Sequence, residues 1–251
     1  MSAPLQADVS EDGWLGGRLR LRQPRAGYRA GLDAALLAAA CDATPGMRVL
    51  DAGCGVGAVM LAAAARRPGT RFVGVERDAA AAALARENIA LNAMEDRIEV
   101  VEAPLAEAVR SLGHAAFDAA LANPPFFDDP TTLRGPAPER RAAWLAEEGL
   151  GAWCDILTKA VREGGTLAII HRADRLADVL EGLGRRAGSF AIRPLHPFAE
   201  APAKRVLVRA VRAGRAPLRL LPPLVLHPGA GAARHRPEVE AILRGAAGLD
   251  W

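Results

Sequence analysis

The chain has 251 residues, of which 51% are hydrophobic and 24% are charged, and its formal net charge is +3. This length suits one large α/β domain or two small ones, and the apolar content excludes a disordered chain. The three cysteines are far apart and fit neither a metal-binding spacing nor a disulfide framework, so we expect a reducing, cytoplasmic setting.

The sequence shows no pattern typical of export or of a membrane span. Residues 1–12 include three acidic residues and no apolar core, which is not the pattern of a signal peptide. The longest apolar runs, such as residues 34–41, are too short to cross a bilayer. We therefore expect no contact with membranes.

Basic residues gather at the two ends of the chain. Residues 13–31 contain five arginines and no acid, and residues 201–251 contain nine Lys/Arg against three Asp/Glu. A GC-rich genome would explain the high arginine content, but it would not explain this clustering. The mildly basic balance permits nucleic acid binding without requiring it.

The first predicted elements are a hairpin and a helix. Residues 13–22 alternate between leucine and arginine after their glycines, which predicts an exposed hairpin strand. A helix is expected over residues 34–43 with Asp33 as its N-cap, and Pro45-Gly46 then ends it.

A glycine-rich turn follows a buried strand predicted over residues 47–51. The sequence Asp51-Ala52-Gly53-Cys54-Gly55-Val56-Gly57 leads into a helix expected over residues 58–66. Glycines at such a turn let a ligand approach the backbone, and the helix N-terminus favours a carboxylate or phosphate. The spacing Gly-x-Gly-x-Gly differs from the Gly-x-Gly-x-x-Gly of dinucleotide enzymes. A plain tight turn is the alternative interpretation.

The next predicted strand, residues 71–76, ends in an acid. Glu76 lies 19 residues after Gly57, near the offset at which an acid accepts hydrogen bonds from ribose hydroxyls. A solvated glutamate at a strand end is the alternative. Asp78 is then the expected N-cap of a helix over residues 79–93.

The strand predicted over residues 117–122 leads into Asn123-Pro124-Pro125-Phe126-Phe127. The two prolines end this strand because neither can donate to the ladder, and ligands bind at this end of the strands in open α/β sheets. The Asn123 side-chain oxygen and the Pro124 carbonyl could accept both hydrogens of a nucleobase amine and so orient its lone pair. Pro125 would stiffen the turn, and Phe126 would stack on the base. A Pro-Pro loop with two core phenylalanines is the alternative.

The remaining segments complete an alternation of strands and helices without a repeat or a splitting linker. Residues 128–141 are rich in proline and charge, which predicts a loop beside the turn that could act as a lid. His171, His196 and His227 are expected to be solvated or packed rather than ligands or bases. Strands are predicted over residues 98–102, 166–171, 190–192 and 205–211, and helices from Pro104 onward and over residues 144–162, 173–183 and 237–247.

These features together resemble the class I S-adenosylmethionine-dependent methyltransferases. The 51–57 segment resembles their nucleoside-binding turn, Glu76 their ribose acid, and Asn123-Pro124-Pro125-Phe126 the catalytic turn of the branch that methylates amines of adenine, guanine or glutamine. The resemblance implies S-adenosyl-L-methionine as cofactor and an α/β, Rossmann-like fold with helices on both faces of a seven-stranded, mostly parallel sheet that has one antiparallel strand. We expect one domain over residues 1–251, made of a hairpin and helix (1–46), a Rossmann-like core (47–212) and a C-terminal extension (213–251).

Three segments are also similar to the bacterial tRNA1(Val) adenine-N6 methyltransferase family. They are the run from Gln23 to Ala38, the Asn-Pro-Pro-Phe-Phe turn, and residues 202–208. This resemblance implies that the methylated amine is N6 of an adenine in tRNA. The same chemistry on rRNA, DNA or a protein glutamine is an alternative, and so is a non-catalytic RNA-binding module. The glycine spacing disfavours a nicotinamide-dependent oxidoreductase.

The family resemblance assigns roles to individual residues. Asn123 and Pro124 accept the amine hydrogens, Pro125 and Phe126 complete the catalytic turn, and no metal is needed. Family members commonly carry an acid where this chain has Pro104, so either Glu102, two residues earlier, or backbone groups would take its place. The expected cofactor-binding residues are Tyr28, Arg29, Asp51, Gly53, Gly55, Gly57, Glu76, Arg77 and Glu102. The protein is expected to be a monomer that contacts tRNA phosphates through Arg18, Arg20, Arg22, Lys204 and Arg205.

Overall fold

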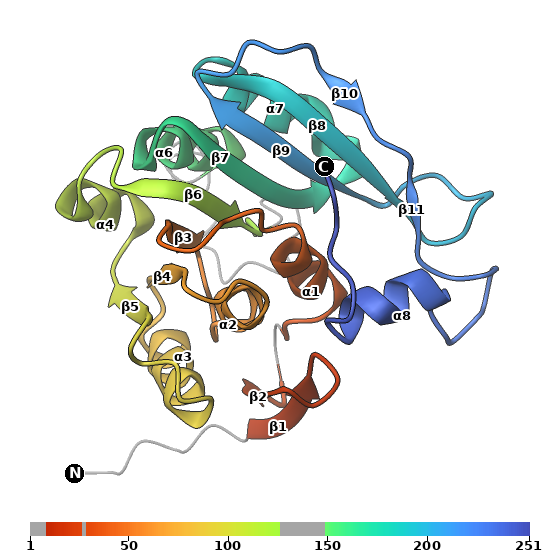
Figure 1. Cartoon of the computed structure of the whole chain (residues 1–251), viewed down its shortest axis with the longest axis horizontal. Helices are drawn as coiled ribbons and strands as arrows, with labels where there is room; N and C mark the ends of the chain where they lie inside the picture. Colours follow the sequence, from red (N-terminus) through yellow and green to blue (C-terminus); the bar gives the residue numbers. More distant parts are fainter. Residues whose placement is uncertain (1–8, 27–28, 126–148) are drawn as a thin grey trace, which may run out of the picture.

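The computed structural model describes residues 9–26, 29–125 and 149–251 and has a mixed β-sheet at its centre (Figure 1). The strands follow the order β10-β8-β9-β7-β6-β3-β4-β5, and β9 is antiparallel to both of its neighbours, β7 and β8. This confirms the predicted α/β sheet, mostly parallel with one antiparallel strand. Its longer strands are β3 (Arg48–Ala52), β4 (Arg71–Glu76), β5 (Ile98–Glu102), β6 (Phe117–Ala122), β7 (Val161–Arg172), β8 (Ala187–His196) and β9 (Arg205–Arg212).

In the described residues the sheet has nine strands, so the predicted number of seven was wrong. The two additional strands, β10 (Arg219–Leu220) and β11 (Leu224–Val225), each pair in parallel with β8. Strands of two residues are too short to show any alternation of apolar and polar positions. Pro222 and Pro223 also lie between them, and proline argues against a strand because it cannot donate to the ladder.

Helices cover both faces of the sheet, and each face has its own apolar core. On one face lie α1 (Leu32–Ala39), α2 (Ala58–Arg66), α3 (Ala79–Leu91) and α8 (Pro237–Leu243), which bury Leu36, Met60 and Ile89. The other face carries α4 (Leu105–Leu112), α6 (Leu150–Ala160) and, after the short η2 (Ala173–Arg175), α7 (Leu176–Gly184). None of the helices in the described ranges combines the length and apolar character needed to cross a membrane.

One of the two predicted helix caps is correct. Asp78 is the N-cap of α3, where its carboxylate accepts a hydrogen bond from the Ala81 N–H at 2.9 Å. Asp33 is not a cap: α1 begins at Leu32 after Gly31, and the Asp33 carboxylate instead accepts from Arg205 Nε at 2.9 Å. The competing partner is a strand residue far along the chain, which a local capping pattern cannot reveal.

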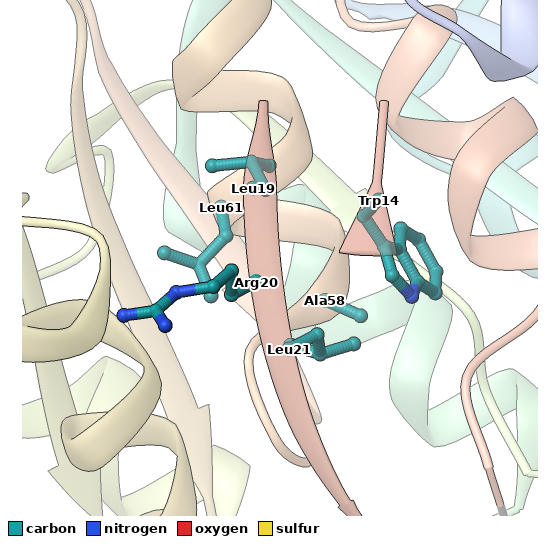
Figure 2. Close-up of a pocket in the computed structure, with 6 residues that line it drawn as sticks. All are labelled: Trp14, Leu19, Arg20, Leu21, Ala58 and Leu61. Carbon is teal, nitrogen blue, oxygen red and sulfur yellow. The ribbon is translucent and has the colours of Figure 1, made fainter. Parts of the chain in front are cut away.

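The N-terminal hairpin consists of β1 (Val9–Trp14) and β2 (Leu19–Pro24), and it packs beside α2 and α3. It was predicted to be exposed, but Leu19, Leu21 and Gln23 are buried while Arg20 remains exposed. Figure 2 shows the residues that line a pocket between the hairpin and α2: Trp14, Leu19, Arg20, Leu21, Ala58 and Leu61. One face of the hairpin is therefore part of the core.

Candidate functional site

The carboxyl ends of three adjacent strands bring the main predicted residues together. In the parallel register of the sheet, Ala52 of β3 lies opposite both Val75 of β4 and Ala122 of β6. The next residue on each strand is Gly53, Glu76 and Asn123, respectively. These residues belong to the amide turn, the glycine turn and the strand-end acid. All three therefore lie level with one another at the carboxyl ends of the strands, where ligands bind in this class of fold.

The backbone of the glycine turn requires glycine and leaves space for a ligand. Gly53, Gly55 and Gly57 have φ angles of +65°, +54° and +88°, which residues other than glycine rarely adopt. A Cβ atom added at Gly55 would meet no atom within 4 Å, whereas one added at Gly53 would lie 2.6 Å from the Trp153 ring. The turn is therefore open at Gly55 and covered by Trp153 at Gly53.

The Glu76 carboxylate is oriented by two backbone groups. One oxygen accepts from the Gly55 N–H at 2.9 Å, and the other accepts from the Asp78 N–H at 2.9 Å. A carboxylate has about four acceptor positions, so this one can still accept from hydroxyl groups. An oriented acid beside an open glycine fits the ribose hydroxyls of the cofactor that the family resemblance implies.

Asp51 supports the same turn from the interior of the protein. Its side chain is buried, and its carboxylate accepts a hydrogen bond from the Met60 N–H in the first turn of α2 at 3.0 Å. Burial, with a smaller contribution from the charge of Glu76, raises the pKa of Asp51 to about 7. This carboxyl group therefore connects β3 to α2 and titrates near neutral pH.

Replacing Asp51 with asparagine should flatten the dependence of stability on pH between about 4 and 7. The carboxyl ionises near 3.8 in the unfolded chain and near 7 in the folded protein, so its protonation stabilises the folded state. This stabilisation is fully present below the unfolded pKa and is lost as the pH rises through the folded pKa. Between these two pH values the free energy of unfolding of the wild-type protein should fall by on the order of a few kcal/mol relative to that of the variant. Urea unfolding of both proteins across this pH range would test this, and a constant difference between them would contradict it.

The amide turn begins where β6 ends. Asn123 is half-buried, Pro124 is buried, and the strand before them is almost fully buried. The stacking residue Phe126, the predicted loop over residues 128–141 and Tyr28 lie outside the described residues. Their assigned roles stay predictions.

Two further residues predicted to bind the cofactor form ion pairs with other parts of the chain. The Arg29 guanidinium pairs with Asp12 at 2.6 Å and donates to the Pro24 carbonyl at 2.8 Å, so it stabilises the base of the hairpin. Glu102 is exposed at the end of β5, opposite Glu76, and pairs with Arg86 at 3.3 Å. Arg77 follows Glu76 at the same edge. Cofactor binding by these residues remains a prediction.

All four arginines expected to contact tRNA have partners within the protein. Arg18 donates to the Gly245 carbonyl at 3.0 Å, which links the hairpin to the end of α8. Arg20 and Arg22 both pair with Glu11 of β1, at 3.1 and 3.2 Å. Arg205, at the start of β9, pairs with Asp33 of α1 at 2.9 Å, and Lys204 before it is exposed.

The sequence pattern did not identify three residues that support the site or the hairpin beside it. Trp153 on α6 covers Gly53, and Asn88 on α3 bonds to Val56 of the glycine turn and to Arg22 of the hairpin. Asn92, the C-cap of α3, bonds to the hairpin. Asn88 was a signal, because asparagine is unfavourable in the interior of an alanine-rich helix unless its amide has partners, whereas Asn92 follows the helix as its C-cap and gives no such signal. Within the described ranges, no group of three or more His, Cys, Asp or Glu residues could hold a metal ion.

Comparison with known proteins gives one family model and several relatives. The model of the methyltransferase small domain matches residues 29–134, which include the glycine turn, Glu76 and Asn123. A protein of Aeromonas hydrophila named tRNA1(Val) (adenine(37)-N6)-methyltransferase is 35% identical over 136 residues, which are 53% of this chain and 56% of that protein. The protein of the same name from Bacteroides thetaiotaomicron is 33% identical over 67% of this chain and 69% of its own length. The chain thus spans little more than half of the first relative and about two thirds of the second.

Solved structures share the fold. A protein of Agrobacterium tumefaciens described as a predicted O-methyltransferase has a TM-score of 0.72 and 28% identity, over 86% of this chain and 98% of its own. An S-adenosylmethionine-dependent O-methyltransferase of Thermotoga maritima has a TM-score of 0.54 and 17% identity, over 77% of this chain and 69% of its own. The second likeness concerns the fold alone.

Proposed function

We propose that this chain, which belongs to the S-adenosylmethionine-dependent methyltransferases of the methyltransferase small domain family, methylates N6 of an adenine in tRNA. The observation that carries the proposal is the position of the Asn123-Pro124-Pro125 turn level with Gly53 and Glu76 at one edge of the sheet. In this proposal, the acceptors for the amine lie beside the residues that would bind the nucleoside part of the cofactor.

The proposed chemistry depends on positioning. An amine on a nucleobase is a poor nucleophile because its lone pair is delocalised into the ring. The Asn123 side-chain oxygen and the Pro124 carbonyl would accept its two hydrogens and direct the lone pair at the electrophile, in a turn whose prolines restrict the backbone. When bound, S-adenosylmethionine supplies an electrophilic methyl group without a metal. No general base is needed before attack, because the amine becomes acidic only after methylation.

Two observations favour an amine in tRNA over other acceptors. A pair of acceptors suits an amine, which has two hydrogens, better than a hydroxyl group, which has one. The relatives from Aeromonas hydrophila and Bacteroides thetaiotaomicron carry names that specify adenine N6 in tRNA1(Val). The name of the Agrobacterium tumefaciens protein specifies an oxygen instead, so the experiment must distinguish the two atoms.

Nucleoside mass spectrometry tests the proposal directly. The protein would be incubated with methyl-labelled S-adenosylmethionine and, separately, with tRNA, rRNA and DNA from cells that lack it, and with total protein from those cells. We expect the label in N6-methyladenosine from the tRNA fraction. Label only in rRNA, in DNA or in a protein glutamine would overturn the substrate assignment, and label on an oxygen would overturn the chemistry.

Replacing Arg20 and Arg22 together with glutamine should weaken the salt dependence of tRNA binding. Each phosphate contact contributes just under one unit to the slope of log affinity against log salt, so the slope should fall by up to about two units. Arg18 stays unchanged because its guanidinium donates to the Leu15 and Gly245 carbonyls and so supports the fold. Filter binding at several salt concentrations would measure the slope.

The matched control for this double variant is Arg71→Gln. Arg71 is an exposed arginine at the amino end of β4, whereas the glycine turn lies at the carboxyl end of the neighbouring strand β3. Its replacement should leave the slope unchanged. A double variant with the wild-type slope would mean that Arg20 and Arg22 serve only their ion pairs with Glu11 and Glu87.

A further inference from the structure

We propose that Asn88 is a positioning residue for the glycine turn. Its buried side-chain amide holds the Val56 carbonyl and joins the turn to the N-terminal hairpin. This inference rests on the proposed cofactor site at Gly53–Gly57. It concerns a residue on α3 that lies outside the three strand-end motifs.

The Asn88 amide uses both of its donor hydrogens and its oxygen. Its side chain is fully buried, and its nitrogen donates to the Val56 carbonyl at 2.9 Å and to the Arg22 carbonyl at 2.9 Å. Its oxygen accepts from the Arg22 N–H at 2.7 Å. A single side chain therefore contacts the glycine turn and the middle of β2 at the same time.

Asn92, one helical turn later, makes the same kind of contact with the hairpin, but its hydrogen bonds go to Arg20 and Asn88 and not to the glycine turn. Its oxygen accepts from the Arg20 N–H at 2.9 Å, and its nitrogen donates to the Arg20 carbonyl at 2.7 Å and to the Asn88 carbonyl at 2.7 Å. Residues four apart on a helix rise by about 6 Å, and residues two apart on a strand by about 6.8 Å. The two amides therefore match the spacing of Arg20 and Arg22 and pair with β2 as a neighbouring strand would.

The bond to Val56 fixes the peptide that precedes α2. The carbonyl of the Val56–Gly57 peptide accepts from Asn88, and its N–H donates to the Cys54 carbonyl at 2.9 Å. Gly57 follows with a φ of +88° and is the N-cap of α2. Both ends of this peptide are thus held, and its orientation determines how the turn presents its backbone to a ligand.

Without Asn88 the Val56 carbonyl and both backbone groups of Arg22 would lose their partner. A polar group left unpaired in the interior is costly, so the peptide should rotate or admit water, and the turn would no longer be held ready for the cofactor. Because one amide bonds both to the glycine turn and to the hairpin, docking of the hairpin and binding of the cofactor should favour each other.

The test compares Asn88→Ala with Asn92→Ala. Each change removes one amide and three hydrogen bonds of α3, but only the first removes the bond to the turn. We expect the dissociation constant of S-adenosylmethionine, measured by calorimetry, to rise about tenfold in Asn88→Ala and to stay within about twofold in Asn92→Ala. With the tRNA substrate, Asn88→Ala should raise the KM for the cofactor and largely retain kcat. Both variants should unfold at lower temperature than the wild type.

Each alternative result has a distinct meaning. Equal cofactor affinity in Asn88→Ala and the wild type, or an equal loss in both alanine variants, would overturn the role of the Val56 bond. If Asn88→Ala does not fold, Asn88→Ser leaves a hydroxyl that can bond to water in the vacated space but is too short to hold the Val56 and Arg22 carbonyls together, and it should also weaken cofactor binding about tenfold. Wild-type affinity in a folded Asn88→Ser would likewise overturn the inference. A wild-type protein that binds no S-adenosylmethionine would instead refute the proposed function.

Discussion

Replacing Asn123 with alanine should lower turnover at saturating cofactor at least 100-fold and leave the affinity for S-adenosylmethionine within about twofold. The side-chain oxygen would hold the amine in the transition state but would not contact the cofactor. An interaction that matters mainly in the transition state lowers kcat far more than it weakens cofactor binding. A loss of 100-fold corresponds to about 2.7 kcal/mol of transition-state stabilisation. Single-turnover kinetics on unmodified tRNA, together with calorimetry, would measure both quantities.

Two companion variants make this result interpretable. Asn123→Asp retains an acceptor oxygen at the same position, so it should lose less activity than the alanine variant. Asn92→Ala makes the same chemical change at the C-cap of α3, away from the end of β6, and should keep kcat near the wild-type value. Unchanged single-turnover rates in Asn123→Ala would contradict the catalytic assignment of the turn.

The arrangement of the candidate site could be predicted because it depends on local patterns. Each of the three motifs ends a short apolar run, and such runs form parallel strands whose carboxyl ends share an edge of the sheet. The parallel register of β6, β3 and β4 then places Asn123, Gly53 and Glu76 level with one another. No long-range information beyond the order of the strands was needed.

The contacts that support the site could not be predicted because their partners are distant in the sequence. Asn88 bonds to Arg22, Asp33 pairs with Arg205, and Trp153 covers Gly53. A local pattern shows only that a polar residue stands in an apolar helix or that an acid stands near a helix start. The choice of partner is made by the tertiary packing, and it decided against Asp33 as a cap.

The environment of the arginines also differs from what the sequence indicated. Residues 13–31 contain no acid, yet Glu11 lies across the hairpin from Arg22 in the β1–β2 register. Arg20 and Arg22 therefore share one carboxylate, and a phosphate would have to compete with it. A run of like charge along the chain does not by itself make a patch of like charge in the fold.

Replacing Glu76 with alanine should weaken S-adenosylmethionine binding by roughly 1.5–3 kcal/mol, or about 10- to 150-fold, because a charge-assisted acceptor is lost. The structure adds a second cause. The Glu76 carboxylate accepts from the Gly55 N–H and the Asp78 N–H, so its removal also releases the glycine turn and the start of α3. The loss should therefore lie toward the upper end of this range.

Calorimetry on Glu76→Ala, Glu76→Gln and Glu99→Ala would separate these causes. Glutamine retains one acceptor oxygen but not the charge, so its affinity should fall between those of the wild type and the alanine variant. Glu99 is an exposed glutamate of β5 that pairs with Arg48 at the start of β3, and its removal should leave affinity unchanged. Wild-type affinity in Glu76→Ala, or tighter binding of NAD than of S-adenosylmethionine by the wild type, would refute the assignment of Glu76 to the cofactor ribose.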